Sequence, residues 1–261
     1  MTGPFDSTGT GVDASVPVEV PLEPTGHERR SMDRLRAALE VFLCSGIPTQ
    51  LFVSGLLLAA HVQPLKDGQL DATWVSLVTL GDTLLVLGLA VLLIRSHGES
   101  PRELFFDARP ALIEAVYGVL LVVPLLMGVA LVVLWLRLSL PALHNVAENP
   151  FGAMLQSRLA TVAFAVVALV GGAVREEVQR AFLLTRFERH LGGPVVGLVV
   201  TSLAFGAGHW VQGWDSAIAI GLLGAVWGFI YLRRRSVVAP MVSHAGFNSF
   251  EIVQFLIAGS V

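Results

Sequence analysis

The sequence predicts an all-α fold, a polytopic bundle of membrane-spanning helices, and three observations predict it. Hydrophobic residues make up 54% of the 261 residues and charged residues only 14%, whereas soluble globular domains carry about 25% charged residues. Several apolar runs reach the roughly 20 residues with which a helix crosses a bilayer. Basic residues also concentrate in alternate segments between these runs, as the positive-inside rule expects.

Composition and charge exclude several classes of protein. Cys44 is the single cysteine of the chain, so a small scaffold stapled by internal disulfides is excluded. The net charge of −3 comes without a basic face, which argues against nucleic-acid binding. We therefore expect the partners to be the lipid bilayer and a peptide-like substrate, and no nucleic acid.

The beginning of the chain differs from the rest in composition. It is rich in Gly, Pro, Ser and Thr, and no Lys or Arg occurs before Arg29. Such a segment does not bury enough apolar surface to fold by itself. We predict a disordered tail over residues 1–35 and a single transmembrane domain over residues 36–261.

The apolar runs predict about seven transmembrane helices, within a range of about six to eight. The first run contains Pro48, which kinks a helix or divides it in two. Residues 212–215 make a tight turn between two short runs near the end. The predicted spans are residues 37–62, 74–94, 111–136, 159–187, 194–212, 216–232 and 237–258.

Basic residues predict the orientation of these spans. With the N-terminus inside, the outside segments contain only Lys66, Arg137 and Arg158. This bias supports a cytoplasmic-membrane protein whose C-terminus lies outside. The inside segments contain Arg29, Arg30, Arg34, Arg36, Arg95, Arg102, Arg109, Arg186, Arg189, Arg233, Arg234 and Arg235.

A charged hexapeptide, residues 175–180, interrupts the fourth span. Glu176 and Arg180 are four residues apart, so they share a helix face and are expected to pair. An alternative is that the span ends at Val174 and the hexapeptide begins an amphipathic helix at the membrane surface. However, the 16 apolar residues before it cover only about 24 Å, and apolar character resumes after it.

Two further polar groups lie in the last spans. His209 shares a helix face with Phe205, and His244 shares one with Asn248. Ionisable groups within a bilayer cost several kcal/mol, so they mark functional sites. The alternatives are an interfacial histidine for the first group and hydrogen bonding between helices for the second. Asp82, in an earlier span, either pairs with another buried polar group or lines a substrate cavity.

These polar groups are expected to lie at similar depths in the bilayer. At 1.5 Å per residue, Glu176, His209 and His244 lie roughly 12–22 Å from the inner ends of their helices. We therefore expect them to reach one cavity in the middle to inner part of the membrane. A carboxylate, two imidazoles and an amide in such a cavity can activate water and stabilise an oxyanion.

These motifs, in this order, resemble the CPBP family of CAAX-protease and bacteriocin-processing intramembrane proteases, also called the Abi or type II CAAX prenyl endopeptidase family. The resemblance covers about residues 155–255 and implies a catalytic core at about residues 155–258. Phe205 to His209 and His244 to Asn248 have the spacing of the family.

The first motif departs from the family pattern, Glu-Glu-x-x-x-Arg, because Arg180 follows the glutamate pair after only two residues. Anchoring the pattern on Arg180 makes Glu176 the second glutamate and puts Arg175 in place of the first. Anchoring it on the pair puts the arginine one residue early. Glu176 is a motif glutamate in both registers, and Glu177 is one in the second register only.

The resemblance implies a role for each site residue. Glu176 and His209 would activate water, with the choice between Glu176 and Glu177 as the base left open. His244 and Asn248 would stabilise the oxyanion of the tetrahedral intermediate. Arg180 would orient Glu176 and keep it charged. The implied substrates are prenylated CAAX tails and leader peptides.

Cofactor use is left open by the sequence. The chain lacks a His-Glu-x-x-His motif, which supplies two zinc ligands and a base from one helix. Two histidines and a glutamate from separate helices would suit zinc, but water activation by a glutamate requires no metal, and we expect no cofactor.

Two other functions remain alternatives. One is a non-catalytic membrane scaffold of the same fold, which the irregular first motif favours. The other is a proton-coupled transporter, because buried Glu, His and Arg also build proton relays. Inverted repeats are typical of many transporters, and none is visible in this sequence.

Overall fold

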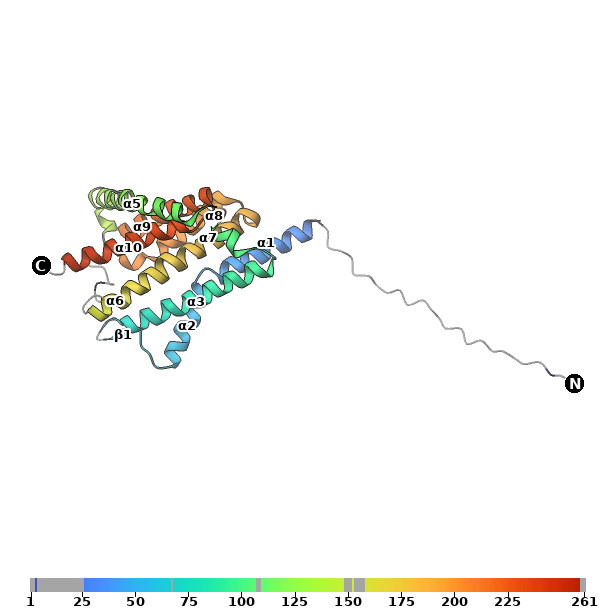
Figure 1. Ribbon diagram of the computed structural model, residues 1–261. Coiled ribbons are helices and arrows are strands. Elements are labelled where there is room, and N and C mark those ends of the chain that lie inside the picture. Colours follow the sequence, from blue (N-terminus) through green and yellow to red (C-terminus); the bar gives the residue numbers. More distant parts are fainter. Residues whose placement is uncertain are drawn as a thin grey trace.

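The structure is a computed structural model that describes residues 3, 26–66, 68–106, 109–147, 152 and 158–258. Helices dominate these residues (Figure 1), which confirms the predicted all-α fold. The elements are α1 (Gly26–Leu43), α2 (Ile47–Ala59), β1 (Leu65–Lys66), β2 (Gln69–Leu70), α3 (Ala72–Ser96), α4 (Pro101–Phe106), α5 (Ala111–Ser139), η1 (Pro141–Leu143), α6 (Arg158–Val167), η3 (Ala168–Arg175), α7 (Glu176–His190), α8 (Pro194–Gly208), η4 (Trp210–Gln212), α9 (Trp214–Arg234) and α10 (Val238–Ala258).

Helix α1 begins at Gly26, within the predicted tail of residues 1–35. Arg36 and Glu40 form an ion pair of 3.3 Å one turn apart, and Ala37 and Glu40 are buried. These contacts hold the part of the helix that follows residue 35. Residues 1, 2 and 4–25 of the predicted tail lie outside the described residues.

The first predicted span is broken, as Pro48 predicts. It consists of α1 and α2, which meet at a bend of 40°. Gly46 precedes α2 in a left-handed conformation with φ 88°, which a glycine adopts without steric cost. Pro48 then occupies the first turn of α2, where its missing N–H leaves no helix bond unmade.

The predicted fourth span, residues 159–187, is helical but not uniform. It consists of α6, the π-helix η3 and α7 in direct succession. Gly171 and Gly172 of η3 allow neighbouring helices to approach closely. A Cβ at Gly171 would overlap Thr79 of α3, and a Cβ at Gly172 would lie 2.7 Å from the Asn248 Nδ2 atom of α10.

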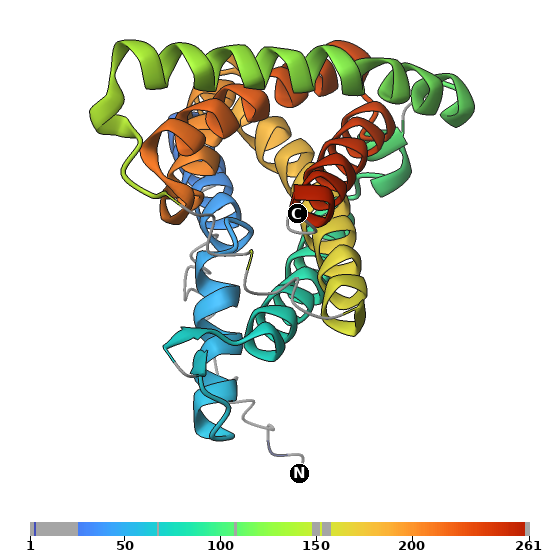
Figure 2. The ribbon, with the colours of Figure 1, turned by 90° about the vertical axis from the view of Figure 1, so that its left-hand side faces the viewer.

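The C-terminal helices form the compact side of the bundle. α8 packs against α9, and α5 lies across α9 and α10 (Figure 2). Glycines again permit the closest approaches, because a Cβ at Gly206 of α8 would lie 3.1 Å from the Gly221 Cα atom of α9. α2 and the β1–β2 hairpin lie on the opposite side of the molecule from α5 (Figure 2).

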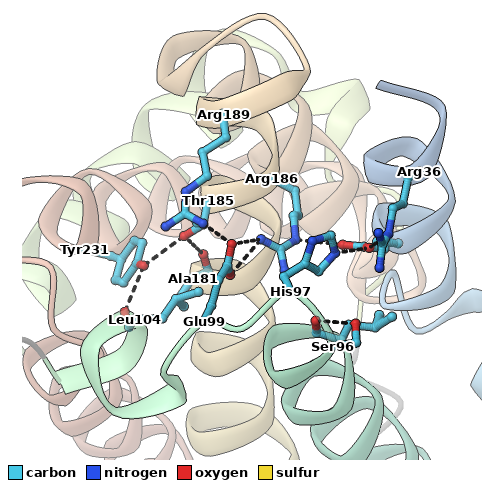
Figure 3. Close-up of polar contacts among 12 residues, drawn as sticks. Arg36, Ser96, His97, Glu99, Leu104, Ala181, Thr185, Arg186, Arg189 and Tyr231 are labelled. Carbon is cyan, nitrogen blue, oxygen red and sulfur yellow. Dashed lines mark hydrogen bonds and ion pairs between the residues drawn. The ribbon is translucent and has the colours of Figure 1, made fainter. Parts of the chain in front are cut away.

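A network of charges joins α1, the end of α3 and α7 (Figure 3). His97 Nε2 lies 2.6 Å from Glu40 Oε1, and Arg186 Nε lies 2.8 Å from Glu40 Oε2. Arg186 Nη1 also lies 3.0 Å from Glu99 Oε2, and Arg189 pairs with the same carboxylate. Arg186, which is only 1% exposed, is therefore the centre of a link between the two halves of the chain.

Several long apolar helices fit a membrane protein. Within the described residues, α3, α5 and α9 are long and apolar enough to cross a bilayer, and the bent α1–α2 pair is a fourth candidate. The exact number of seven spans is not confirmed. One reason is that the π-helix divides the fourth predicted span into pieces of 10, 8 and 15 residues.

Candidate active site

The first turn of α7 presents two neighbouring glutamates in different surroundings. Glu177 is 2% exposed. It accepts hydrogen bonds from Arg180 Nη1 and from His244 Nδ1, the second at 2.9 Å. The side chain of Glu176 is 20% exposed, and its Oε2 atom lies 3.8 Å from His244 Nε2. The two carboxylates therefore contact opposite edges of one imidazole ring.

The expected pairing of Arg180 with Glu176 is wrong, because Arg180 pairs with Glu177. Two aromatic rings explain this choice. The Arg180 guanidinium lies 4.5 Å from the ring centre of Phe205 and 5.7 Å from that of Trp227. These cation–π contacts hold the guanidinium on the side of the helix where Glu177 is located.

His244 is held on one ring face and at one edge. It is 5% exposed, and its ring stacks on Trp227 at 3.9 Å with an angle of 16°. Trp227 is itself held by a hydrogen bond from Nε1 to Ser243 Oγ. Because the Glu177 carboxylate accepts at Nδ1, this nitrogen carries a proton and Nε2 faces Glu176.

Asn248 lies one turn beyond His244, against the π-helix. Its Nδ2 atom donates a hydrogen bond of 3.1 Å to the Ala168 carbonyl oxygen. The position of Gly172 explains the close approach: a Cβ there would lie 2.7 Å from Asn248 Nδ2 and 3.9 Å from His244 Nε2. Gly172 thus leaves open the space that His244 and Asn248 border.

His209 lies at the end of α8, next to the same aromatic group. Its Nδ1 atom is 2.8 Å from the Phe205 carbonyl oxygen, and its ring is 4.7 Å from the Phe205 ring. The Phe205 ring also lies 6.4 Å from that of His244. Within the described part of the chain, His209 therefore contacts Phe205 rather than Glu176, and one aromatic ring links the two imidazoles.

These contacts bring together side chains from α7, α8 and α10, in the segment where the family motifs occur. Residues 157–250 match the Rce1-like family of type II CAAX prenyl endopeptidases. The match confirms the resemblance that the motifs predict. Comparisons with curated proteins and with solved structures gave no match.

The Rce1-like match implies a protease, and it includes all the predicted site residues. They are Glu176, Glu177, Arg180, His209, His244 and Asn248. Two aromatic residues that hold this group, Phe205 and Trp227, lie in the same segment. Phe205 is part of a family motif, whereas a buried tryptophan in an apolar helix carries no sequence signal that separates it from the core.

A cavity of about 190 Å³ borders Glu176 and extends outside the Rce1-like segment. Its polar wall includes Gln50 of α2 and Asp82 of α3 together with Arg175 and Glu176. Its apolar wall includes Val75, Phe164, Val167 and Ala168. Asp82 therefore lines this cavity and also pairs with Arg175, as expected for a buried polar residue with a charged partner. The N-terminal half contributes to a site that the sequence locates on the last four spans.

A second and larger cavity, of about 420 Å³, lies at the charge network. It is lined by Glu99, Glu188, Arg189, Tyr231 and Arg235, among others. Arg235 donates hydrogen bonds of 2.5 Å from both terminal nitrogens to Glu188, and they hold the pKa of this carboxyl below its usual value. The smaller cavity is the better site candidate, because Glu176 lines it and His244 Nε2 lies 3.8 Å from the Glu176 carboxylate.

The potential metal ligands that the structure describes near the site do not converge on one point. Among the described residues, no three His, Cys, Asp or Glu side chains converge closely enough to hold a metal ion, whereas a catalytic zinc takes three protein ligands. His209 and His244 are separated by Phe205, and Arg180 occupies a lone pair of Glu177. These residues, as arranged, do not fit a zinc site.

Proposed function

We propose that this chain is an intramembrane endopeptidase that cleaves a lipid-modified or membrane-proximal peptide with a water molecule activated by Glu176. The observation that carries this proposal is the 3.8 Å approach of Glu176 Oε2 to His244 Nε2 beside a cavity. A carboxylate and an imidazole that face one another across a small opening can act on the same peptide bond.

In the proposed reaction, Glu176 accepts a proton from water while the water oxygen attacks the carbonyl carbon. The negative charge that develops on the carbonyl oxygen is stabilised by hydrogen bonds from His244 Nε2–H and Asn248 Nδ2–H. Glu176 then returns its proton to the amide nitrogen, and the carbon–nitrogen bond breaks. His209, the other residue of the expected water-activating pair, packs against Phe205, whose ring also approaches that of His244.

Glu177 and Arg180 are assigned positioning roles. Glu177 accepts the Nδ1–H of His244, so protonation of the ring places the second N–H at Nε2, toward the cavity. Arg180 compensates the charge of Glu177, whose burial without a cation would be costly. Glu176 is then the base, because its carboxylate is the one that borders the cavity.

The walls of the cavity indicate the kind of substrate, and the basic residues of the charge network indicate the orientation of the protein in the membrane. Its apolar wall, which includes Val75 and Phe164, adjoins the polar wall that contains Glu176, which suits a peptide segment attached to an apolar chain. Arg36, Arg186 and Arg189 lie in one charge network (Figure 3). The part of the bundle that carries this network would face the cytoplasm, with the N-terminus inside.

A second candidate function is a non-catalytic membrane scaffold of the same fold. The observation that favours it is Arg175, which stands where one register of the family motif has a glutamate. In that case, exchange of Glu176 would leave the function of the protein unchanged.

The deciding experiment measures cleavage of farnesylated CAAX peptides and leader-type peptides by the purified protein in detergent. Glu176→Gln keeps the shape of the side chain but removes the base, so we expect cleavage to be abolished while folding is retained. Glu103→Gln is the matched control, since this glutamate is exposed. The same assay with a chelator tests metal dependence. Equal cleavage by wild type and Glu176→Gln would contradict the assignment.

A further inference from the structure

A buried ion pair connects the N-terminal half of the chain to the residue before Glu176. Asp82 of α3 is 2% exposed. Its Oδ2 atom pairs with Arg175 Nη2 and receives a hydrogen bond of 3.4 Å from Gln50 Nε2, and its Oδ1 atom accepts from Thr49 Oγ1. Asp82 therefore holds donors from α2 and from the π-helix at one carboxylate.

Arg175 is also confined on its other side. It is 8% exposed, and a Cβ on Gly46 would overlap its Nη2 atom. Gly46 is the residue at which the first span breaks. The break between α1 and α2 thus makes room for the guanidinium and, one turn later, supplies Thr49 and Gln50 to its partner Asp82.

The Asp82–Arg175 ion pair lies directly before the proposed base, Glu176, in the chain. Arg175 ends the π-helix, and Glu176 begins α7. Both side chains border the 190 Å³ cavity. An arginine buried within a membrane domain is costly unless a partner compensates its charge, and here Asp82 is that partner.

We propose that Arg175, held by Asp82, is a positioning residue that directs the carboxylate of Glu176 toward His244 and the cavity. This inference rests on the proposed function, because it assigns Glu176 the role of base. The charged and titratable groups around Glu176 are Arg175 on its own helical segment, Asp82 of α3, His244 of α10, and the Glu177–Arg180 pair. Arg180 pairs with Glu177, so Arg175 is the cation that borders the same cavity as Glu176.

The first test separates positioning from simple structural support. Asp82→Asn, Arg175→Gln and the double variant are compared by thermal unfolding, kcat and KM. Each single variant leaves one buried charge unpaired, so we expect lower thermal stability. The double variant removes both charges and retains polar side chains, so stability should recover. Because the double variant lacks the guanidinium that orients the Glu176 carboxylate, kcat should stay about tenfold below wild type, with KM changed less than about twofold.

The Glu114–Arg234 pair provides the matched control. Glu114 is fully buried and receives two hydrogen bonds from Arg234, at a place without contact to Glu176. The double variant Glu114→Gln/Arg234→Gln should recover stability and keep the kcat of wild type. Recovery of wild-type kcat by Asp82→Asn/Arg175→Gln as well would overturn the proposal, because the pair would then be structural only.

A second test requires no peptide cleavage. In a Cys44→Ala/Glu176→Cys background, the new thiol is modified with anionic and with cationic methanethiosulfonate reagents. Removal of the cation by Arg175→Gln should lower the anionic-to-cationic rate ratio about tenfold, since residues 175 and 176 border the same cavity and neighbouring charges interact strongly within a protein. Asp82→Asn should raise the ratio, and Arg234→Gln should not change it.

The two tests distinguish the two proposals. If wild type cleaves no more than Glu176→Gln, the proposed function fails, and the thiol ratios alone decide the placement of Arg175. If wild type is active but the ratio is unchanged in both Arg175→Gln and Asp82→Asn, the positioning inference fails and the proposed function stands.

Discussion

At the scale of single residues, the geometry of the site depends on which carboxylate pairs with each arginine. Arg180 could reach either glutamate from its place on the helix, and it pairs with Glu177. The aromatic rings of Phe205 and Trp227 determine this selection. Neighbouring glutamates that look equivalent in the sequence thereby have different surroundings, and we propose different roles for them.

This division predicts different effects for the two glutamates. Glu177→Gln keeps the shape of the side chain but weakens its contacts with Arg180 and His244. His244 would then be poorly oriented as a hydrogen-bond donor to the oxyanion. We expect kcat to fall roughly 100-fold, the effect of losing one such donor, while some cleavage remains. Glu176→Gln should leave none. A kcat of Glu177→Gln at the wild-type level, measured beside Glu103→Gln, would show that His244 needs no orienting carboxylate.

Gly46 gives a prediction about stability. Gly46→Ala places a side chain at φ 88°, where it also overlaps Arg175. The left-handed backbone alone costs about 1–2 kcal/mol, and displacement of the guanidinium adds to it. We expect a clearly lower unfolding temperature. Gly88→Ala is the control, because it lies within α3 and a Cβ there meets nothing within 4 Å; equal unfolding temperatures for both variants would refute the prediction.

At the scale of elements, the break in the first span and the π-helix in the fourth both supply residues that bind the Asp82 carboxylate. The break brings Thr49 and Gln50 to Asp82, and the π-helix ends at Arg175, which pairs with the same carboxylate. The sequence predicts the break, because proline has a direct effect on the helix backbone. It does not predict the π-helix, because glycines in an apolar run are equally compatible with a regular helix.

The contact between the ends of α7 and α9 makes stability depend on pH. Arg235 stabilises the charged form of Glu188 and lowers its pKa. A lowered carboxyl pKa contributes stability above the unfolded-state value of about 4.3, and this contribution is lost as pH falls through the folded-state value. Unfolding temperatures of wild type and Glu188→Gln should therefore differ at pH 7 and converge in acid. A constant difference would contradict this account.

At the scale of the whole molecule, both halves of the chain contribute residues to the cavity beside Glu176. The sequence motifs indicate the family that residues 157–250 match, and the structure places Glu176 Oε2 3.8 Å from His244 Nε2. The contributions of Gln50 and Asp82 could not be derived, because they depend on the packing of α2 and α3 against η3. Helical periodicity indicates which residues share a face, but it does not specify which other helix that face contacts.

This dependence predicts the behaviour of a divided chain. Residues 151–261 expressed alone lack Asp82, so Arg175 is left without its carboxylate, and we expect little folded protein. Co-expression with residues 1–150 should restore a folded complex, as judged by co-purification and unfolding temperature. A stable fragment of residues 151–261 on its own would show that the Asp82–Arg175 pair is dispensable for folding.

The π-helix also makes the chain sensitive to length rather than to composition. In a π-helix each N–H bonds one residue further back than in an α-helix, so η3 holds more residues per turn than the helices on either side of it. Deleting one alanine or valine there would leave hydrophobicity almost unchanged and allow the segment to continue as a regular α-helix. Each residue of an α-helix turns its successors by about 100°, more than a residue of the π-helix does, so one residue fewer in α-helical form carries α7 through nearly the same total rotation. The segment therefore tolerates the loss of one residue, whereas one added residue would turn Glu176 away from His244.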